Sequence, residues 1–331
     1  MPDFNKLKNI LTKYNSFLLT THVNPDADAI GSELALYEAL KLMGKNEIHI
    51  INTSSTPYNL IFLDRSNVIQ QYEETKHEEL LRSVDLLIGL DFNRSDRLIR
   101  MREVFTNSSN YKIIIDHHQD EEDFVNDSFV DTLYSATGHI IYDFIQKTSI
   151  VELTYQIAYP LYAAIMTDTG SFRFERTSPE IHFIAADLIS KGVNPTEVYD
   201  YIYNQNKFSK IKLLGNAINS FKLYGNNNQI GYMIITQEEF RSFNASEQDT
   251  DTFVNFALSV EGVKLGILFI ELKDGFKVSL RSKGRIPVNK LAAEFGGGGH
   301  LNASGIRLKN ESMNKFISII LQKAEDYLER E

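Results

Sequence analysis

The sequence predicts an α/β protein of two domains, an N-terminal doubly wound parallel sheet and a smaller C-terminal α/β domain. A chain of 331 residues exceeds what one hydrophobic core usually organises. In the first 120 residues short β-branched runs alternate with helical patterns, whereas strand-like runs and a hairpin turn follow residue 225. The apolar fraction of 43% and the charged fraction of 24% are ordinary for a globular protein.

Four short apolar runs predict strands in the N-terminal part, and they are Ser16–Thr21, Glu47–Asn52, Asp85–Asp91 and Lys112–Asp116. Runs that are hydrophobic almost throughout are typical of parallel strands covered by helices on both faces. A helical pattern at 29–43 follows the first strand, and helical patterns dominate from residue 137 to about residue 221. These alternating elements indicate the doubly wound sheet.

The C-terminal part is predicted to contain the strands Gln229–Thr236, Val263–Leu272, Phe276–Ser282 and Ala303–Leu308, with a helix at Val288–Phe295. The tripeptide Lys273-Asp274-Gly275 has the composition of a hairpin turn between two of these strands. The predicted domains are therefore residues 1–205 and 225–331, and residues 206–224 are expected to form a helical connector.

Composition excludes several classes of function. The chain has no cysteine, so disulfides, thiolate zinc sites and cysteine nucleophiles are excluded, and a reducing cytoplasm is the expected compartment. A net charge of −10 argues against binding along long nucleic acid, which requires a broad basic surface. No apolar run is long enough to predict a membrane span, and the N-terminus has the pattern of a helix leading into a strand.

Acidic and imidazole side chains follow three of the predicted strands and one predicted helix. In a parallel sheet the carboxyl ends of the strands meet at one edge, where ligands bind. The candidates at this edge are His22, Asp26, Asp28, Asp91, Asp116, His117, His118 and, after the helix at 158–166, Asp168. Taken alone, Asp26 and Asp28 could merely cap the next helix, with Asp28 at the N-cap position. Four separate segments carrying such groups favour a metal site instead.

The types of side chain indicate the metal. Oxygen ligands with a little imidazole favour Mn²⁺, with Mg²⁺ as a substitute, over structural zinc. Four carboxylates exceed the needs of one ion that also binds substrate, so two ions roughly 3.5–4 Å apart are expected. The other histidines in strands or helices, His49, His77, His139 and His182, are expected to be structural or surface residues without neighbouring carboxylates.

The C-terminal part carries a basic segment and a glycine run. Residues 277–290 contain five basic and no acidic side chains, which could be a solvated strand and loop or a phosphate-binding segment. In the second case, Arg281 would offer a planar fork and Ser282 a hydroxyl to phosphate oxygens. The run that includes Gly298 and Gly299 could be a linker, but it lies between a predicted helix and a strand and is followed by His300. Backbone amides without side chains can approach an anion closely.

These residues together resemble the DHH phosphoesterases. The segment Asp116-His117-His118 resembles the motif that gives the family its name. The family's other three motifs are resembled by NPDADAIGS, by the aspartate of LIGLD and by that of MTDTGSF. The run Gly296–Gly299 with His300, followed by Ala303-Ser304-Gly305, resembles the signature of the DHH-associated domain. Ser304 replaces a common alanine. Within the family, a chain of this size is most similar to the group of nano-RNases and adenosine 3′,5′-bisphosphate phosphatases.

The resemblance implies two metal ions, an active site in a cleft between the domains, and a homodimer. One ion would be held by His22, Asp26, Asp91 and Asp168, and the other by Asp28, Asp91, His117 and Asp168. Asp116 would lie behind the ligands and orient an imidazole, and His118 would face the substrate phosphate. Arg281, Ser282, Gly298, Gly299 and His300 would bind substrate in the second domain.

The expected reaction is in-line attack of a bridging hydroxide on very short oligonucleotides or on adenosine 3′,5′-bisphosphate. Cleavage of cyclic or linear di-adenylate is an alternative. Family II pyrophosphatases resemble only the first domain, so pyrophosphate is a less favoured substrate. The single-strand exonucleases of the family carry extra nucleic-acid-binding domains, so that activity is less favoured as well. A non-catalytic nucleotide sensor remains a further alternative, although such a protein would be free to lose bridging carboxylates, and none is missing.

Overall fold

Six parallel strands form the first sheet, in the order β3-β2-β1-β4-β5-β6. The computed structural model describes residues 1–329, and the chain divides into two units at residues 205 and 206. The strands of the first unit are β1 (Ser16–Thr21), β2 (Glu47–Asn52), β3 (Ile69–Gln71), β4 (Leu86–Leu90), β5 (Tyr111–Asp116) and β6 (Asp127–Val130). The parallel pairing confirms the predicted fold class.

Two strands of this sheet were not predicted from the sequence. β3 is a three-residue segment with two glutamines, and β6 has four residues beginning with Asp127 and Ser128. Both lie at the edges of the sheet, where a strand is paired on one side only and the apolar pattern is weak. The predicted central strands β1 and β2 have the bounds expected.

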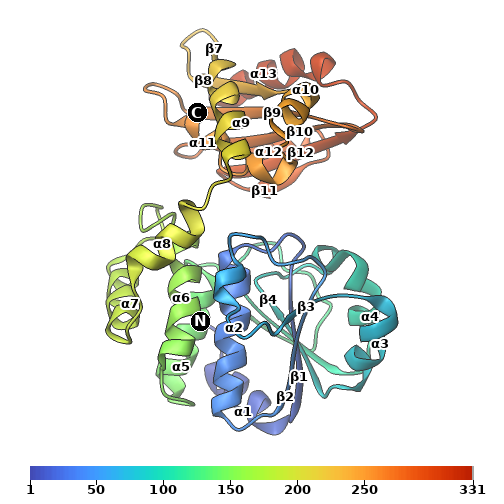
Figure 1. The fold of residues 1–331 in the computed structure, drawn as a ribbon, viewed down its shortest axis with the longest axis vertical. Helices are drawn as coiled ribbons and strands as arrows, with labels where there is room; N and C mark the ends of the chain where they lie inside the picture. Colours follow the sequence, from blue (N-terminus) through green and yellow to red (C-terminus); the bar gives the residue numbers. More distant parts are fainter. Residues whose placement is uncertain (330–331) are drawn as a thin grey trace. The chain divides into compact units, whose positions relative to one another are not determined.

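Eight α-helices are described in residues 1–205: α1 (Phe4–Lys13), α2 (Ala27–Leu42), α3 (Glu74–Ser83), α4 (Arg102–Asn107), α5 (Thr137–Thr148), α6 (Tyr155–Asp168), α7 (Pro179–Ser190) and α8 (Pro195–Tyr203), with 3₁₀ turns at Ile61–Leu63 and Ser95–Met101. Helices α2, α5 and α6 lie on one side of the sheet and α3 and α4 on the other (Figure 1). Alternate residues of β1 fill the two cores, because Phe17 and Leu19 belong to the first cluster and Leu18 to the second.

Helices α2 and α6 pack closely enough to require a glycine between them. A side-chain carbon at Gly31 would lie 2.4 Å from the carbonyl oxygen of Pro160. Helix α2 begins just beyond the carboxyl end of β1, and α6 ends at Asp168. The close contact therefore fixes the start of one helix relative to the end of the other.

The second unit contains a mixed sheet in the order β11-β12-β10-β9-β8-β7, in which only β8 and β9 run parallel. Its strands are β7 (Lys222–Tyr224), β8 (Ile230–Ile235), β9 (Leu265–Leu272), β10 (Gly275–Ser282), β11 (Gly298–His300) and β12 (Ala303–Lys309). The helices are α9 (Phe208–Asn219), α10 (Gln237–Phe243), α11 (Val254–Leu258), α12 (Val288–Ala293) and α13 (Met313–Glu329), with a 3₁₀ turn at Glu247–Thr250. The predicted hairpin joins β9 to β10.

Helices cover both faces of this second sheet. One core joins the strands to α12 and α13 through Leu291 and Ile320, and the other joins them to α9 and α10 through Leu213 and Phe240. Helix α9 falls in the segment expected as a connector, and its buried Leu213 shows that it packs as part of the second unit. No helix in residues 1–329 is long and apolar enough to cross a membrane.

Candidate functional site

The edge of the first sheet brings the predicted metal ligands together. The carboxyl ends of β1, β4 and β5 are adjacent in the sheet and lead into His22, Asp91 and His117. Asp28 lies in the first turn of α2, and Asp168 is the last residue of α6. All but Asp26 and Asp168 of the six predicted ligands are buried.

Asp91 lies between two histidines. Its Oδ2 is 3.4 Å from Nε2 of His22, and its Oδ1 is 3.6 Å from Nε2 of His117. The residue has a left-handed backbone with φ of 64°, a conformation that Asp tolerates better than most residues. One carboxylate therefore presents an oxygen to each of two neighbouring imidazoles.

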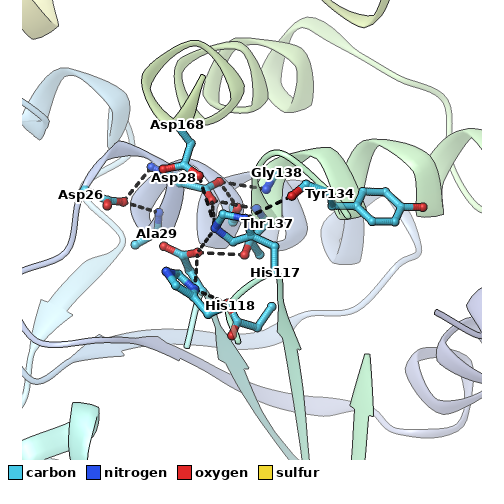
Figure 2. Close-up of polar contacts among 12 residues, drawn as sticks. Asp26, Asp28, Ala29, His117, His118, Tyr134, Thr137, Gly138 and Asp168 are labelled. Carbon is cyan, nitrogen blue, oxygen red and sulfur yellow. Dashed lines mark hydrogen bonds and ion pairs between the residues drawn. The ribbon is translucent and has the colours of Figure 1, made fainter. Parts of the chain in front are cut away.

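Three groups of potential ligands lie around this carboxylate, each with ligand atoms within 4.8 Å of one another. The first is His22, Asp26 and Asp91, the second is Asp28, His117 and Asp168, and the third is Asp91, His117 and His118. In the second group, Nε2 of His117 is 3.7 Å from Oδ2 of Asp28 and 3.3 Å from Oδ2 of Asp168 (Figure 2). The spacing is that of side chains gathered around a shared centre.

Asp26 and Asp28 have different structural roles, which corrects one expectation. The N-cap of α2 is Asp26, and not Asp28, because Oδ1 of Asp26 accepts the amides of Asp28 and Ala29 at 3.0 and 3.1 Å (Figure 2). The Asp28 carboxylate instead accepts the amides of Thr137 and Gly138 at 2.7 and 2.9 Å. It thereby caps α5, which begins at Thr137 and has no capping side chain of its own.

Sequence reasoning missed the segment that supports these ligands. The Thr137 hydroxyl donates to Oδ1 of Asp91 at 2.9 Å, and Nδ1 of His117 is 3.3 Å from the Tyr134 carbonyl oxygen. That contact requires the proton on Nδ1, so the Nε2 lone pair of His117 faces the carboxylates. The local pattern of residues 134–138 is that of an ordinary helix start. Its role becomes visible only in the structure, where its amides and the Thr137 hydroxyl donate to carboxylates that are distant in sequence.

Asp116 and His118 form a pair beside the cluster. Nδ1 of His118 is 2.7 Å from Oδ1 of Asp116, which is fully buried. Oδ2 of Asp116 has no hydrogen-bond partner among the described residues. The imidazole nearest to this carboxylate is thus that of His118, whose side chain is 28% exposed.

Crowding of carboxylates shifts the acid–base properties of the site. Burial, followed by the charges of neighbouring aspartates, raises the pKa of Asp91 and of Asp168 well above the usual range. Burial also raises the pKa of Asp28 to about 6 and lowers that of His117 to about 4. A divalent cation would favour the ionised carboxylates and the neutral imidazole and thereby offset these costs.

The predicted substrate residues lie in the second unit. Arg281 is half-buried on β10, and its Nη1 donates to the Leu280 carbonyl at 3.0 Å. The Ser282 hydroxyl is buried, donates to the Ile286 carbonyl at 2.7 Å and accepts from Asn302. This hydroxyl already serves the loop, so a contact with substrate stays a prediction.

The glycine run has a definite conformation. Gly298, Gly299 and His300 form strand β11, which pairs with β12. A side-chain carbon on Gly299 would lie 2.5 Å from the Ala303 carbonyl oxygen, whereas one on Gly298 would have no atom of the described chain within 4 Å. Gly298 is exposed and has room for a side chain, so packing within its own domain does not require a glycine there. His300 is exposed at the end of this strand.

A pocket of about 280 Å³ adjoins the glycine run. Its lining residues are Lys277, Gly296, Gly297, Gly298, Gly305, Ile306 and Arg307. Lys277 and Arg307 face each other in the register of β10 and β12, and both pair with the carboxylate of Glu247. The pocket therefore combines glycine backbone with two cationic side chains whose charge is partly offset by Glu247.

The remaining histidines differ from the expectation in one case. His77 is buried and its Nδ1 accepts the Glu73 amide at 3.0 Å, in line with a structural role. His139 was expected to have no carboxylate near it, but Asp143 and Glu180 have ligand atoms within 4.8 Å. Asp143 lies four residues after His139 on α5, a local spacing that could have indicated it, whereas Glu180 lies on α7, distant in sequence, and could not be inferred from local pattern.

Two family models match the chain. That of the DHH family, N-terminal domain, matches residues 16–165, and that of the DHHA1 domain matches residues 227–326. The first range contains the candidate ligands from His22 to His117, and Asp168 lies just beyond it.

Known proteins match over nearly the whole length. The chain is 32% identical to the bifunctional oligoribonuclease and PAP phosphatase NrnA of Thermus thermophilus, covering 94% of this chain and 90% of that protein. It is 26% identical to the protein of the same description from Bacillus subtilis, covering 91% of each. A crystal structure of an exopolyphosphatase-related protein from Bacteroides fragilis matches with a TM-score of 0.93 at 31% identity, covering 99% of this chain and 97% of that chain.

Proposed function

Because the chain belongs to the DHH family of phosphoesterases, we propose that it hydrolyses very short oligoribonucleotides and adenosine 3′,5′-bisphosphate at a centre of two metal ions. The observation that carries the proposal is the position of Asp91, which presents one oxygen to His22 and the other to His117. A carboxylate placed in this way can bridge two cations.

The residues at this edge of the sheet fit two divalent ions. The set is rich in buried carboxylate oxygens, and the described residues place no Lys or Arg ammonium or guanidinium in an ion pair with Asp28, Asp91 or Asp168. We propose that His22, Asp26, Asp91 and Asp168 hold one ion and that Asp28, Asp91, His117 and Asp168 hold the other. When bound, the ions lower the pKa of water and offset negative charge on the phosphoryl group.

The protein's own groups would orient the ligands and the substrate. The Thr137 hydroxyl and the amides at the start of α5 hold the carboxylates of Asp91 and Asp28 in place. The Tyr134 carbonyl fixes the tautomer of His117. His118, held by Asp116 and partly exposed, would donate a hydrogen bond to a phosphate oxygen of the substrate.

The second domain would bind the rest of the substrate. Arg281, His300 and the backbone at Gly298 and Gly299 are the proposed contacts with a phosphate or terminal nucleotide. The neighbouring pocket supports this assignment, because Lys277 and Arg307 bring two cationic side chains beside the glycine run, where they also pair with Glu247. The Ser282 hydroxyl already donates to the Ile286 carbonyl, so we propose that Ser282 contributes less to substrate binding than the other residues.

The test is an assay of purified protein with Mn²⁺ on a defined set of substrates. It comprises adenosine 3′,5′-bisphosphate, labelled di- to pentanucleotides, cyclic and linear di-adenylate, and pyrophosphate. We expect release of AMP from the bisphosphate and of nucleoside monophosphates from the oligonucleotides. Turnover of di-adenylates or pyrophosphate alone would replace the proposed substrates, and binding without turnover of any compound would favour a sensor.

A further inference from the structure

A second group of potential metal ligands lies outside the candidate active site, between α5 and α7. His139 and Asp143 are four residues apart on α5 and so share one face of that helix. Glu180 lies in the first turn of α7. Each of the three offers a ligand atom within 4.8 Å of the other two.

The imidazole of His139 has an unused nitrogen. The residue is 5% exposed, and Nε2 is buried without a hydrogen-bond partner in the part of the chain that is described. The other nitrogen, Nδ1, is 3.4 Å from the Ser135 hydroxyl. A buried polar atom without a partner destabilises the folded protein, and a cation bound at Nε2 would remove that cost.

Burial lowers the pKa of His139, although the charges of Asp143 and Glu180 act in the opposite direction. The ring is therefore neutral near pH 7 and has a lone pair to offer, as a metal ligand requires. The Tyr134 ring packs against the imidazole with 4.5 Å between centroids. This contact limits the orientations that the imidazole can adopt.

The two carboxylates differ in exposure. Oδ2 of Asp143 accepts the Tyr134 hydroxyl at 2.8 Å and the Lys147 ammonium at 2.5 Å, and no bond to its Oδ1 is seen among the described residues. Glu180 is exposed, so its side chain can move toward an ion from solvent. Lys147 offsets the charge of Asp143, whereas no ion pair of Glu180 is seen among the described residues.

We propose that His139, Asp143 and Glu180 form a third divalent-cation site, with Zn²⁺ as its preferred ion. One imidazole and two carboxylates match the ligands that zinc takes in proteins, and nitrogen and oxygen sites bind Zn²⁺ more tightly than Mn²⁺. An ion held there joins α5 to α7. It also lies beside Tyr134, whose ring packs against His139. The carbonyl oxygen of Tyr134 is 3.3 Å from Nδ1 of His117 in the candidate active site.

The experiment counts bound ions and does not depend on the proposed function. Metal-free protein is equilibrated by dialysis against buffered Zn²⁺, and zinc per chain is measured by mass spectrometry. Wild type and the control Glu152→Gln, an exposed residue of the same unit, should each bind one more Zn²⁺ than Glu180→Gln and His139→Gln. Circular dichroism checks that His139→Gln is folded, because this residue is buried. If His139→Gln is unfolded, the test relies on Glu180→Gln, because Glu180 is exposed.

A second comparison separates this site from the active site. In an Asp91→Ala background, where the proposed catalytic centre is disrupted, adding Glu180→Gln should weaken the remaining zinc binding by at least about tenfold. Hydrolysis by Glu180→Gln with saturating Mn²⁺ should stay near wild type. Equal zinc content and equal affinity in wild type, Glu180→Gln and His139→Gln would overturn the site, whatever the outcome of the substrate assays.

Discussion

The Thr137 hydroxyl donates a hydrogen bond to Oδ1 of Asp91 over 2.9 Å and so links the start of α5 to the end of β4. Both residues are buried, with Thr137 fully inaccessible and Asp91 2% exposed. A charged acceptor in such surroundings makes a stronger hydrogen bond than a neutral one. The orientation of the bridging carboxylate is therefore set by a residue 46 positions away in the chain.

Replacing Thr137 by valine should weaken the metal centre without removing a ligand. Valine keeps the branched shape and removes the hydroxyl, so Asp91 loses its hydrogen bond. Groups that support a metal ligand contribute about 10- to 100-fold in affinity or activity, and we expect a loss of that size in Mn²⁺ affinity and kcat/KM. Thr137→Ser retains the hydroxyl and is the control. Equal kinetics for the valine and serine variants would show that the bond is dispensable.

Asp91→Ala and Asp168→Ala should each abolish hydrolysis. Each removes a carboxylate that lies within 3.6 Å of His117 Nε2 and that is proposed to serve both ions. Activity is measured on the best substrate at saturating Mn²⁺, with exposed Asp123→Ala as the control for loss of an acidic residue. Activity within about tenfold of wild type, a barrier change of only about 1.4 kcal/mol, would contradict the bridging assignment.

Metal dependence should follow the chemistry of the ligands. We expect hydrolysis with Mn²⁺, weaker hydrolysis with Mg²⁺, and loss on treatment with EDTA that Mn²⁺ reverses. Imidazole ligands at His22 and His117 suit Mn²⁺ better than Mg²⁺, which prefers oxygen ligands. Turnover that EDTA leaves unchanged would rule out the two-metal mechanism.

Arg281→Ala and His300→Ala should distinguish substrate binding from chemistry. Loss of a hydrogen bond between a charged group and phosphate costs about 1.5–3 kcal/mol. This predicts a fall of roughly ten- to a hundredfold in kcat/KM for nucleotide substrates. Bis(p-nitrophenyl) phosphate, an activated diester without a nucleotide, should be affected far less.

The control for these two variants is Arg241→Ala, an exposed arginine on α10 of the same unit. An equal fall with both kinds of substrate would assign Arg281 and His300 to the catalytic centre itself. If neither substrate were affected, the basic segment and the glycine run would have only structural roles.

Glu33 should make stability depend on pH. The residue is fully buried in α2, where Oε2 accepts from Asn52 at 2.8 Å and Oε1 has no partner in residues 1–329. Burial raises its pKa from 4.5 to about 8, although the bond from Asn52 acts against the shift. The folded protein thus retains a proton that the unfolded chain releases above pH 4.5.

Stability should therefore fall as pH rises between these two pKa values, by about 1.4 kcal/mol per pH unit at most. Glu33→Gln is neutral at every pH and should not show this loss. We measure the free energy of unfolding by urea at saturating Mn²⁺. The difference between Glu33→Gln and wild type should shift in favour of the variant by up to about 2–3 kcal/mol from about pH 6 to pH 8. A constant difference across this range would mean that Glu33 is already ionised in the folded state.

The central strands of the first sheet were predictable because β1, β4 and β5 are apolar almost throughout. Polar groups directly after such strands must meet at one edge, so the cluster around Asp91 followed from order along the chain. Edge strands β3 and β6 did not follow, because their residues carry no continuous apolar pattern. The N-cap was misassigned to Asp28 because two aspartates compete within one turn, and only the backbone decides which one begins the helix.

The sequence by itself determined the family, the fold class and the identity of the residues gathered at the sheet edge, since these depend on side-chain type and order. Tertiary structure alone decided which distant groups support them. The amides at the start of α5 bond to Asp28, the Thr137 hydroxyl bonds to Asp91, and Glu180 approaches His139. These contacts arise from helix packing against a common core, and packing joins residues whose separation along the chain carries no local signal.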